Sequence, residues 1–231
     1  MQRHFDEKIQ ELLEKLLLMG RLAESMIQAA MRTLIERKES CCSDVHRKEK
    51  EVNDLQIEID DRAVTLTALQ QPVASDVRFL FMASRIATEL ERIGDQAVNI
   101  CENTHHVLKA PPLKPLVDLP QMGEVAETMV RNALEALVNR DVALANRVLE
   151  EEQRVDAFRD QIFRVLLTYM MADPGTIERA LALILISRNL ERVGDHATNI
   201  AEEVIYLVEG REVRHSHEDP RVSSASRNPV A

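Results

Sequence analysis

One stretch occurs twice in this chain, and the repeat constrains the fold more than any other feature of the sequence. Residues 90–100 read LERIGDQAVNI and residues 190–200 read LERVGDHATNI, so most positions are identical at an offset of 100 residues. A self-match at a fixed offset indicates that one structural unit is used twice. The chain is therefore expected to consist of two similar halves.

Apolar residues around each copy follow the spacing of helices that pack against other helices. In residues 73–108 the apolar positions alternate between steps of three and four, and residues 176–209 repeat the pattern. Such heptad spacing predicts long helices that bury one seam. The predicted seam positions are Ala83, Ile86, Leu90, Ile93, Ala97, Ile100, Thr104 and Val107, then Leu183, Ile186, Leu190, Val193, Ala197, Ile200, Val204 and Leu207.

Four further helices are predicted from apolar periodicity, over residues 5–38, about 43–69, 119–139 and 141–172. The second of these has the sparsest apolar positions, which are Val52, Leu55, Ile59, Val64 and Leu66. Short turns between long helices favour antiparallel neighbours. We therefore predict an all-α protein of two tandem, pseudo-symmetric three-helix bundles, with six long antiparallel helices in total.

The proline-rich segment APPLKPLVDLP predicts the boundary between the halves, because prolines interrupt helices and favour extended chain. We expect a first bundle over residues 5–109, a linker over 110–118 and a second bundle over 119–210. The last segment, 211–231, has no apolar period and is expected to be disordered.

The composition excludes several classes of protein. Among 231 residues, 45% are hydrophobic and only 3% aromatic, with six glycines, which is typical of a globular helical protein. No apolar run reaches the roughly eighteen residues of a bilayer-spanning helix, and no secretory signal is visible. The net charge of −10 disfavours direct nucleic-acid binding and favours cations or basic partners.

The cysteine pattern points to a reducing compartment. The three cysteines are Cys41, Cys42 and Cys101, an odd number that includes no CxxC pair. This pattern fits neither a disulfide framework nor a thiolate zinc site. A cytoplasmic location is therefore expected.

Acidic residues recur in register within the two copies. Glu91 and Asp95 stand four residues apart, as do Glu191 and Asp195, and each pair is followed by an asparagine and a further acid: Asn99 and Glu102, then Asn199 and Glu202. At about 100° per residue, each pair lies more than 90° from the apolar seam, on an outer or flanking face. Solvated surface charge is the ordinary explanation for such residues.

Three observations favour a ligand-binding role instead. The acidic pair occurs in both halves, and each copy contains a helical glycine, Gly94 or Gly194, that costs about 1 kcal/mol relative to alanine. Two ionised carboxylates at this spacing also repel each other. A duplicated and mildly destabilising arrangement of this kind predicts a compensating cation.

A second acidic line is predicted on the neighbouring helices. Glu152 and Asp156 are again four apart, and aligning Val155 with Val52 places Glu49 and Asn53 at the matching positions. Neighbouring antiparallel helices would then supply oxygen ligands to one site in each half, suited to Mg²⁺, Mn²⁺, Ca²⁺ or Fe³⁺. Because Asn53 carries no charge, the first site is expected to be weaker than the second.

Two other patterns are weighed against this site. His196 replaces Gln96 in the second copy and is expected to be a partly buried helix histidine rather than a ligand. Glu102 and His105 form the E-x-x-H spacing of di-iron bundles, but Ile205 replaces the histidine in the second copy, which argues against a di-iron centre. The sequence shows no nucleophile elbow, P-loop or dinucleotide-binding turn.

These motifs resemble those of the PhoU family, the accessory regulators of the bacterial phosphate-specific transport system. The resemblance covers residues 5–209 and rests on both LERxGD copies, on QQPVASDVR at 70–78 and on EVNDL at 51–55. It implies two three-helix bundles with metal sites on an exposed face, often multinuclear iron or zinc clusters, with magnesium or manganese as further candidates. The implied metal ligands are Glu91, Asp95, Glu191, Asp195, Glu152, Asp156, Glu49 and Asn53.

The resemblance also implies a function. Members of the family are cytoplasmic, often dimeric, and reach the membrane only through their partners. They bridge a phosphate ABC transporter, through its ATPase subunit, and a sensor histidine kinase, and they repress the phosphate-starvation response. This implies a non-enzymatic adaptor that modulates phosphate uptake; a carboxylate-cluster metalloenzyme, a metal-storage protein and a purely structural bundle are the alternatives.

Overall fold

Six long α-helices make up nearly all of the computed structural model, which describes residues 2–38, 42–70, 72–113, 116–211 and 213. No strand occurs among these residues, so the predicted all-α class is confirmed. Cys41 and nearly all of the tail predicted over 211–231 lie outside the described residues. The helices are α1 (Gln2–Glu36), α2 (Cys42–Gln70), α3 (Ala74–Leu108), α4 (Asp118–Asn139), α5 (Val142–Ala172) and α6 (Ile177–Glu209), with a 3₁₀ turn η2 (Pro174–Thr176) before α6.

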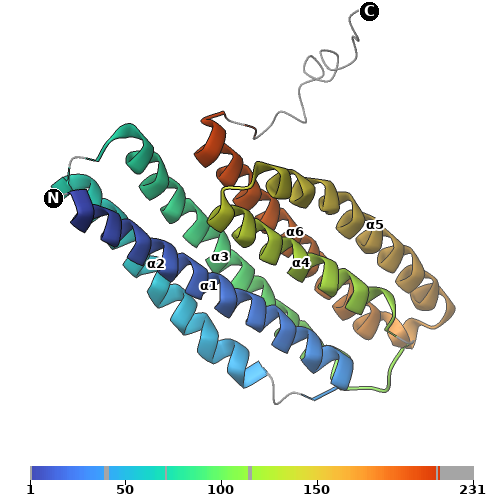
Figure 1. The fold of residues 1–231 in the computed structure, drawn as a ribbon. Coiled ribbons are helices and arrows are strands. Elements are labelled where there is room, and N and C mark those ends of the chain that lie inside the picture. Colours follow the sequence, from blue (N-terminus) through green and yellow to red (C-terminus); the bar gives the residue numbers. More distant parts are fainter. Residues whose placement is uncertain (1, 39–41, 71, 114–115, 212, 214–231) are drawn as a thin grey trace, which may run out of the picture.

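The helices form two three-helix bundles that lie side by side, as predicted (Figure 1). Helices α1, α2 and α3 pack together, and so do α4, α5 and α6. The bundles meet where α3 packs along α6 and α1 packs against α4. The buried side chains form one continuous hydrophobic core through both bundles. None of the helices in the described part of the chain combines the length and apolar character that a bilayer-spanning segment needs.

The heptad seams lie in this core. All eight predicted positions of α3 are buried, and those of α6 are buried except Leu207, which is half-buried. The prediction for Val64 on α2 was wrong, since its side chain is 69% exposed. Ile59 and Leu66 are buried, and Val64 lies five residues after Ile59, which at about 100° per residue turns it away from the core.

Small residues bring α1 and α4 close together at two equivalent places. A Cβ atom on Gly20 would clash with Leu134 Cδ1, and one on Gly123 would lie 3.1 Å from Met31 Cε. The two contacts are related by the same offset of 103 residues, so each helix supplies one glycine and one large side chain. This reciprocity is what an internal two-fold relation between the bundles requires.

The contact between α3 and α6 lacks this reciprocity at its polar positions. His196 Nδ1 of α6 lies 2.8 Å from Glu89 Oε2 of α3, and Asn199 Nδ2 donates to the same oxygen at 2.9 Å. The residues at matching positions are Gln96 and Asn189, both buried and uncharged. The histidine therefore serves the contact between the bundles, as a largely buried helix residue.

Packing accounts for only one of the two helical glycines of the LERxGD copies. A Cβ on Gly94 would meet Met26 Cε at 3.3 Å, and one on Gly194 would meet Val155 Cγ1 at 3.6 Å. Both glycines are buried beneath side chains of the other two helices of their bundle. The space beside Gly194 is large enough for a methyl group, whereas the space beside Gly94 is tighter.

This difference predicts unequal effects of alanine substitution. Gly194→Ala should raise the free energy of unfolding by about 1 kcal/mol, because helix propensity improves without a clash. Gly94→Ala should raise the free energy of unfolding by less, because the end of the Met26 side chain must move by a few tenths of an ångström. Urea unfolding of both variants beside the parent protein measures the difference. A loss of stability in Gly194→Ala would contradict this description of the packing.

Candidate functional site

The first acidic set lies between α2 and α3. Glu91 and Asp95 of α3 and Glu49 and Asn53 of α2 are all half-buried beside the core. Desolvation, followed by the charge of Asp95, raises the pKa of Glu91, and desolvation followed by the charge of Glu49 raises the pKa of Asp95. The structure thus brings three of the residues predicted from the sequence, Glu49, Glu91 and Asp95, into one electrostatically coupled group, with Asn53 one helical turn after Glu49 on α2.

This first set contains an oxygen without a hydrogen-bond partner. The side-chain carbonyl Oδ1 of Asn53 is buried and unpaired, which is costly for a polar atom. Within the described residues, no lysine or arginine forms an ion pair with Glu49, Glu91 or Asp95, and His46 lies 3.9 Å from Glu49. The set is therefore rich in oxygen donors and poor in positive charge.

The second acidic set lies between α5 and α6 and includes a cation. Arg159 of α5 donates from Nη1 to Glu191 of α6 and to Asp156 at 3.0 Å, and it also contacts Asp160 at 2.9 Å. The hydrogen bond to Asp160 is the largest cause of the raised pKa of the arginine. Arg159 was not among the residues predicted from the sequence. Gln56 occupies the matching position in the first half, so the two sets differ in charge here.

Asp195 remains without a positive partner in this second set. Desolvation raises its pKa to about 6, with the charges of Glu191 and then Glu152 adding to the effect. Its side chain is exposed at the surface between the two helices while its carboxyl group is crowded by other acids. The carboxylates here are thus only partly compensated by Arg159.

Neither set is a preformed metal centre as the side chains lie. In the described part of the chain, no group of three or more His, Cys, Asp or Glu side chains is arranged to hold a metal ion. The donor chemistry of the first set nevertheless fits a hard cation. Its three carboxylates lie close enough to interact electrostatically, and Asn53, one helical turn after Glu49 on α2, has an unpaired carbonyl oxygen. In the second set, the Arg159 guanidinium already binds two of the predicted ligands.

The E-x-x-H pattern lies outside the bundle interior. Glu102 and His105 are exposed and line a pocket of about 460 Å³ between the start of α2 and the end of α3, together with Cys42 and Cys101. Ile205, which replaces the histidine in the second half, is buried in the core. The inward-facing arrangement of a di-iron bundle is therefore not formed by these residues.

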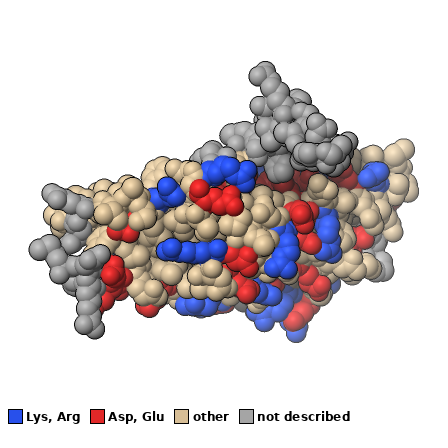
Figure 2. Space-filling view, turned by 45° about the horizontal axis from the view of Figure 1, so that its top comes forward, with Lys and Arg blue, Asp and Glu red and all other residues tan. Residues whose placement is uncertain are grey.

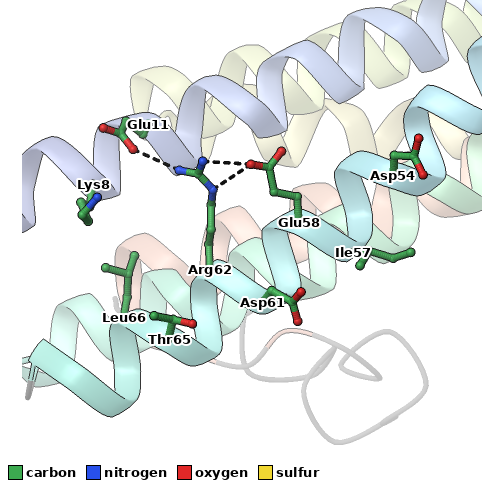
Figure 3. A pocket seen from close by; sticks show the side chains of 9 residues that line it. All are labelled: Lys8, Glu11, Asp54, Ile57, Glu58, Asp61, Arg62, Thr65 and Leu66. Carbon is green, nitrogen blue, oxygen red and sulfur yellow. Dashed lines mark hydrogen bonds and ion pairs between the residues drawn. The ribbon is translucent and has the colours of Figure 1, made fainter.

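A charged pocket between α1 and α2 is held by internal ion pairs (Figure 3). The guanidinium of Arg62 contacts Glu11 at 3.0 Å and Glu58 at 2.9 Å, and Lys15 also contacts Glu58 at 2.8 Å. On the molecular face shown in Figure 2, acidic and basic side chains are interspersed among uncharged areas. Three of its charged residues, Glu11, Glu58 and Arg62, are paired within the protein, so it is a weaker candidate for ligand binding than the two acidic sets.

The fold and the two sets define a class of protein: an all-helical repeat protein with an acidic stripe between the second and third helices of each bundle. The family model for the PhoU domain matches residues 16–104 and 119–204. The chain belongs to the PhoU family, as predicted from its LERxGD motifs.

Several relatives cover almost the whole chain. It is 37% identical over 209 residues to the phosphate-specific transport system accessory protein PhoU homolog of Zymomonas mobilis, covering 90% of this chain and 88% of that protein. The homolog of the same name in Pseudomonas aeruginosa is 36% identical, with 92% and 88% covered.

Solved structures show the same fold. The crystal structure of PhoU from Pseudomonas aeruginosa matches with a TM-score of 0.86 at 35% identity, covering 90% of this chain and all of that one. The phosphate transport system regulatory protein PhoU from Streptococcus pneumoniae matches with a TM-score of 0.82 at 25% identity, covering 90% and 99%.

The raised pKa of Asp195 predicts a pH-dependent stability in metal-free protein. An acid whose pKa is higher in the folded state binds more protons there, so its contribution to stability falls as pH rises from about 4 to 6. Asp195→Asn should therefore be more stable than the parent protein at pH 7.5, by about 1 kcal/mol or less because solvent screens an exposed group. The difference in stability between the variant and the parent protein should disappear below pH 4, where Asp195 is protonated in both the folded and the unfolded state.

Thermal unfolding in a chelator across this pH range measures the effect. Asp54→Asn, which removes the same charge from an exposed position on α2, serves as the control. A stabilisation by Asp195→Asn that is equal at pH 4 and pH 7.5 would show that the ionisation of Asp195 is not its cause.

Proposed function

We propose that this protein is a negative regulator of the phosphate-starvation response that acts as an adaptor on a phosphate ABC transporter. The observation that carries the proposal is the near full-length match to relatives named as accessory proteins of the phosphate-specific transport system. On this proposal the chain is cytoplasmic and not an enzyme, and it contacts the transporter's ATPase subunit and a sensor histidine kinase.

Complementation tests this function. Expression of this chain in a Pseudomonas aeruginosa strain that lacks its own PhoU should restore repression of alkaline phosphatase at high phosphate. The same strain with an empty vector should express the phosphatase constitutively, and phosphate uptake should be measured alongside. Full expression of the folded chain without any repression would overturn the proposal.

Exposed apolar side chains support a docking role. In the first half, Val64 of α2 and Val77 and Phe81 of α3 line a groove of about 580 Å³, and Phe81 is 59% exposed. Matching positions of α5 and α6 are also exposed and apolar: Leu167, Ile177 and Leu181. Apolar surface repeated in both bundles suits a partner that presents two similar contacts, and we propose these two strips as the surface that meets the transporter.

A charge placed in these strips should weaken the association. Phe81→Glu and Leu181→Glu are each expected to reduce binding to the transporter's ATPase subunit by at least about tenfold, because the glutamate would be desolvated at an apolar contact. Val138→Glu is the matched control, since Val138 of α4 is 47% exposed outside both strips. Binding assays with the purified subunit measure the effect, and light scattering reports the oligomeric state.

The outcomes of this test separate two uses of the strips. Unchanged binding by both glutamate variants would remove the strips from the transporter interface. A loss of dimers with unchanged transporter binding would assign them to the proposed homodimer instead. Melting temperatures close to that of the parent protein are required, and the exposure of both side chains predicts them.

Metal binding at the acidic sets is part of this proposal. The first set would use Glu49, Glu91, Asp95 and the Asn53 carbonyl, and the second would use Glu152, Asp156, Glu191 and Asp195, with iron, zinc, magnesium or manganese as candidate ions. A bound ion would neutralise carboxylates that repel one another and fix the surface between neighbouring helices. Protein that remains metal-free after exposure to each of these ions would contradict this part.

The alternative is a metalloenzyme or a metal store that uses the same carboxylates. Metal-loaded protein that hydrolyses a phosphoester, or oxidises Fe²⁺ with turnover, would favour that class. Bound metal without either activity would favour the adaptor.

A further inference from the structure

The two acidic sets differ most at one position of the second helix of each bundle. Arg159 of α5 lies between the helices, where its guanidinium contacts Glu191 across the gap and Asp156 on its own helix. Its side chain is only 30% exposed, and that of Glu191 is 21% exposed. The arginine is therefore an integral part of the second set rather than a mobile surface group.

The first bundle has no positive charge at the matching position. Gln56 stands there, and its amide donates to Thr88 Oγ1 at 3.4 Å. The carbonyl oxygen of Asn53 is buried without a hydrogen-bond partner, although its counterpart Asp156 is bound by Arg159. One set thus has an unsatisfied oxygen donor, and the other has two oxygen donors already engaged.

We propose that Arg159 acts as a built-in cation that keeps metal out of the second set, so that the first set is the principal metal site of the resting protein. A metal ion that used Glu191 and Asp156 would first have to displace two charge-assisted hydrogen bonds from the guanidinium. No such displacement is needed in the first set. This order of affinity is the reverse of the one expected from the sequence, in which the missing charge of Asn53 makes the first set weaker.

The inference rests on the proposed metal binding and is tested by exchanging the two residues. Chelator-treated protein is dialysed against Mn²⁺, and bound metal is measured by elemental analysis. Wild-type protein should bind about one ion per chain, and Arg159→Gln about two, since the second set then resembles the first. Gln56→Arg should bind no ion in the first set. The double variant Gln56→Arg/Arg159→Gln should bind its one ion in the second set instead.

Arg154→Gln is the matched control for the loss of one positive charge. Arg154 lies on the same helix but pairs with Glu151 on the exposed side, at 2.6 Å. This variant should retain the wild-type stoichiometry. Melting temperatures add an independent measurement: Arg159→Gln should melt lower than wild type in chelator at pH 7.5 and recover with Mn²⁺, while Arg154→Gln should not change.

The outcomes distinguish this inference from the underlying metal proposal. Equal metal content in wild type, Arg159→Gln and Gln56→Arg would overturn the role of Arg159 while leaving metal binding intact. Absence of Mn²⁺ from every variant would overturn both. If Arg159→Gln does not fold, Gln56→Arg alone decides, because a guanidinium that leaves the metal of the first set undisturbed is not excluding it.

Discussion

The close packing of α3 along α6 is the constraint on which the rest of the molecule depends. Each of these helices carries an uninterrupted apolar seam, and burying a large aliphatic side chain contributes about 1.5–3 kcal/mol. Both helices also serve as the third helix of their own bundle, so one core runs through the whole protein. The reciprocal glycine contacts between α1 and α4 allow this core to close without a gap.

The position of the acidic sets follows from this packing. Glu91 and Glu191 each directly follow a fully buried leucine of the seam, so their backbone is fixed while their side chains reach the gap toward the neighbouring helix. Carboxylates on such rigid elements cannot easily move apart to relieve their repulsion. Desolvation by burial, and after it the charge of neighbouring carboxylates, raises the pKa values of Glu91, Asp95 and Asp195.

Much of this arrangement could be predicted from the sequence, because it depends on periodic patterns. Helix ends fell within a few residues of the predicted positions, and the seam residues were identified since heptad spacing directly reports a buried stripe. The alignment of the halves also placed Glu49 and Asn53 beside Glu91 and Asp95. Val64 was misplaced because α2 has few apolar residues, so a single exposed valine could be mistaken for part of the seam.

Arg159 was missed for a different reason. A long, flexible side chain can choose among several acidic partners, and the choice depends on the distance between α5 and α6 rather than on spacing along one helix. The unpaired oxygen of Asn53 is likewise visible only when the neighbouring helix is in place. Both features distinguish the two bundles, whereas the repeated motif emphasises what they share.

The hydrogen bond between Glu89 and His196 shows how far the two repeats have diverged. If two copies of the first bundle packed together in this way, Glu89 would face Gln96 at both equivalent contacts. If two copies of the second bundle did so, Asn189 would face His196 at both. Only the mixed pairing brings a carboxylate to an imidazole. The duplicated halves have thus become complementary to each other, and the protein carries the specificity of a heterodimer within a single polypeptide.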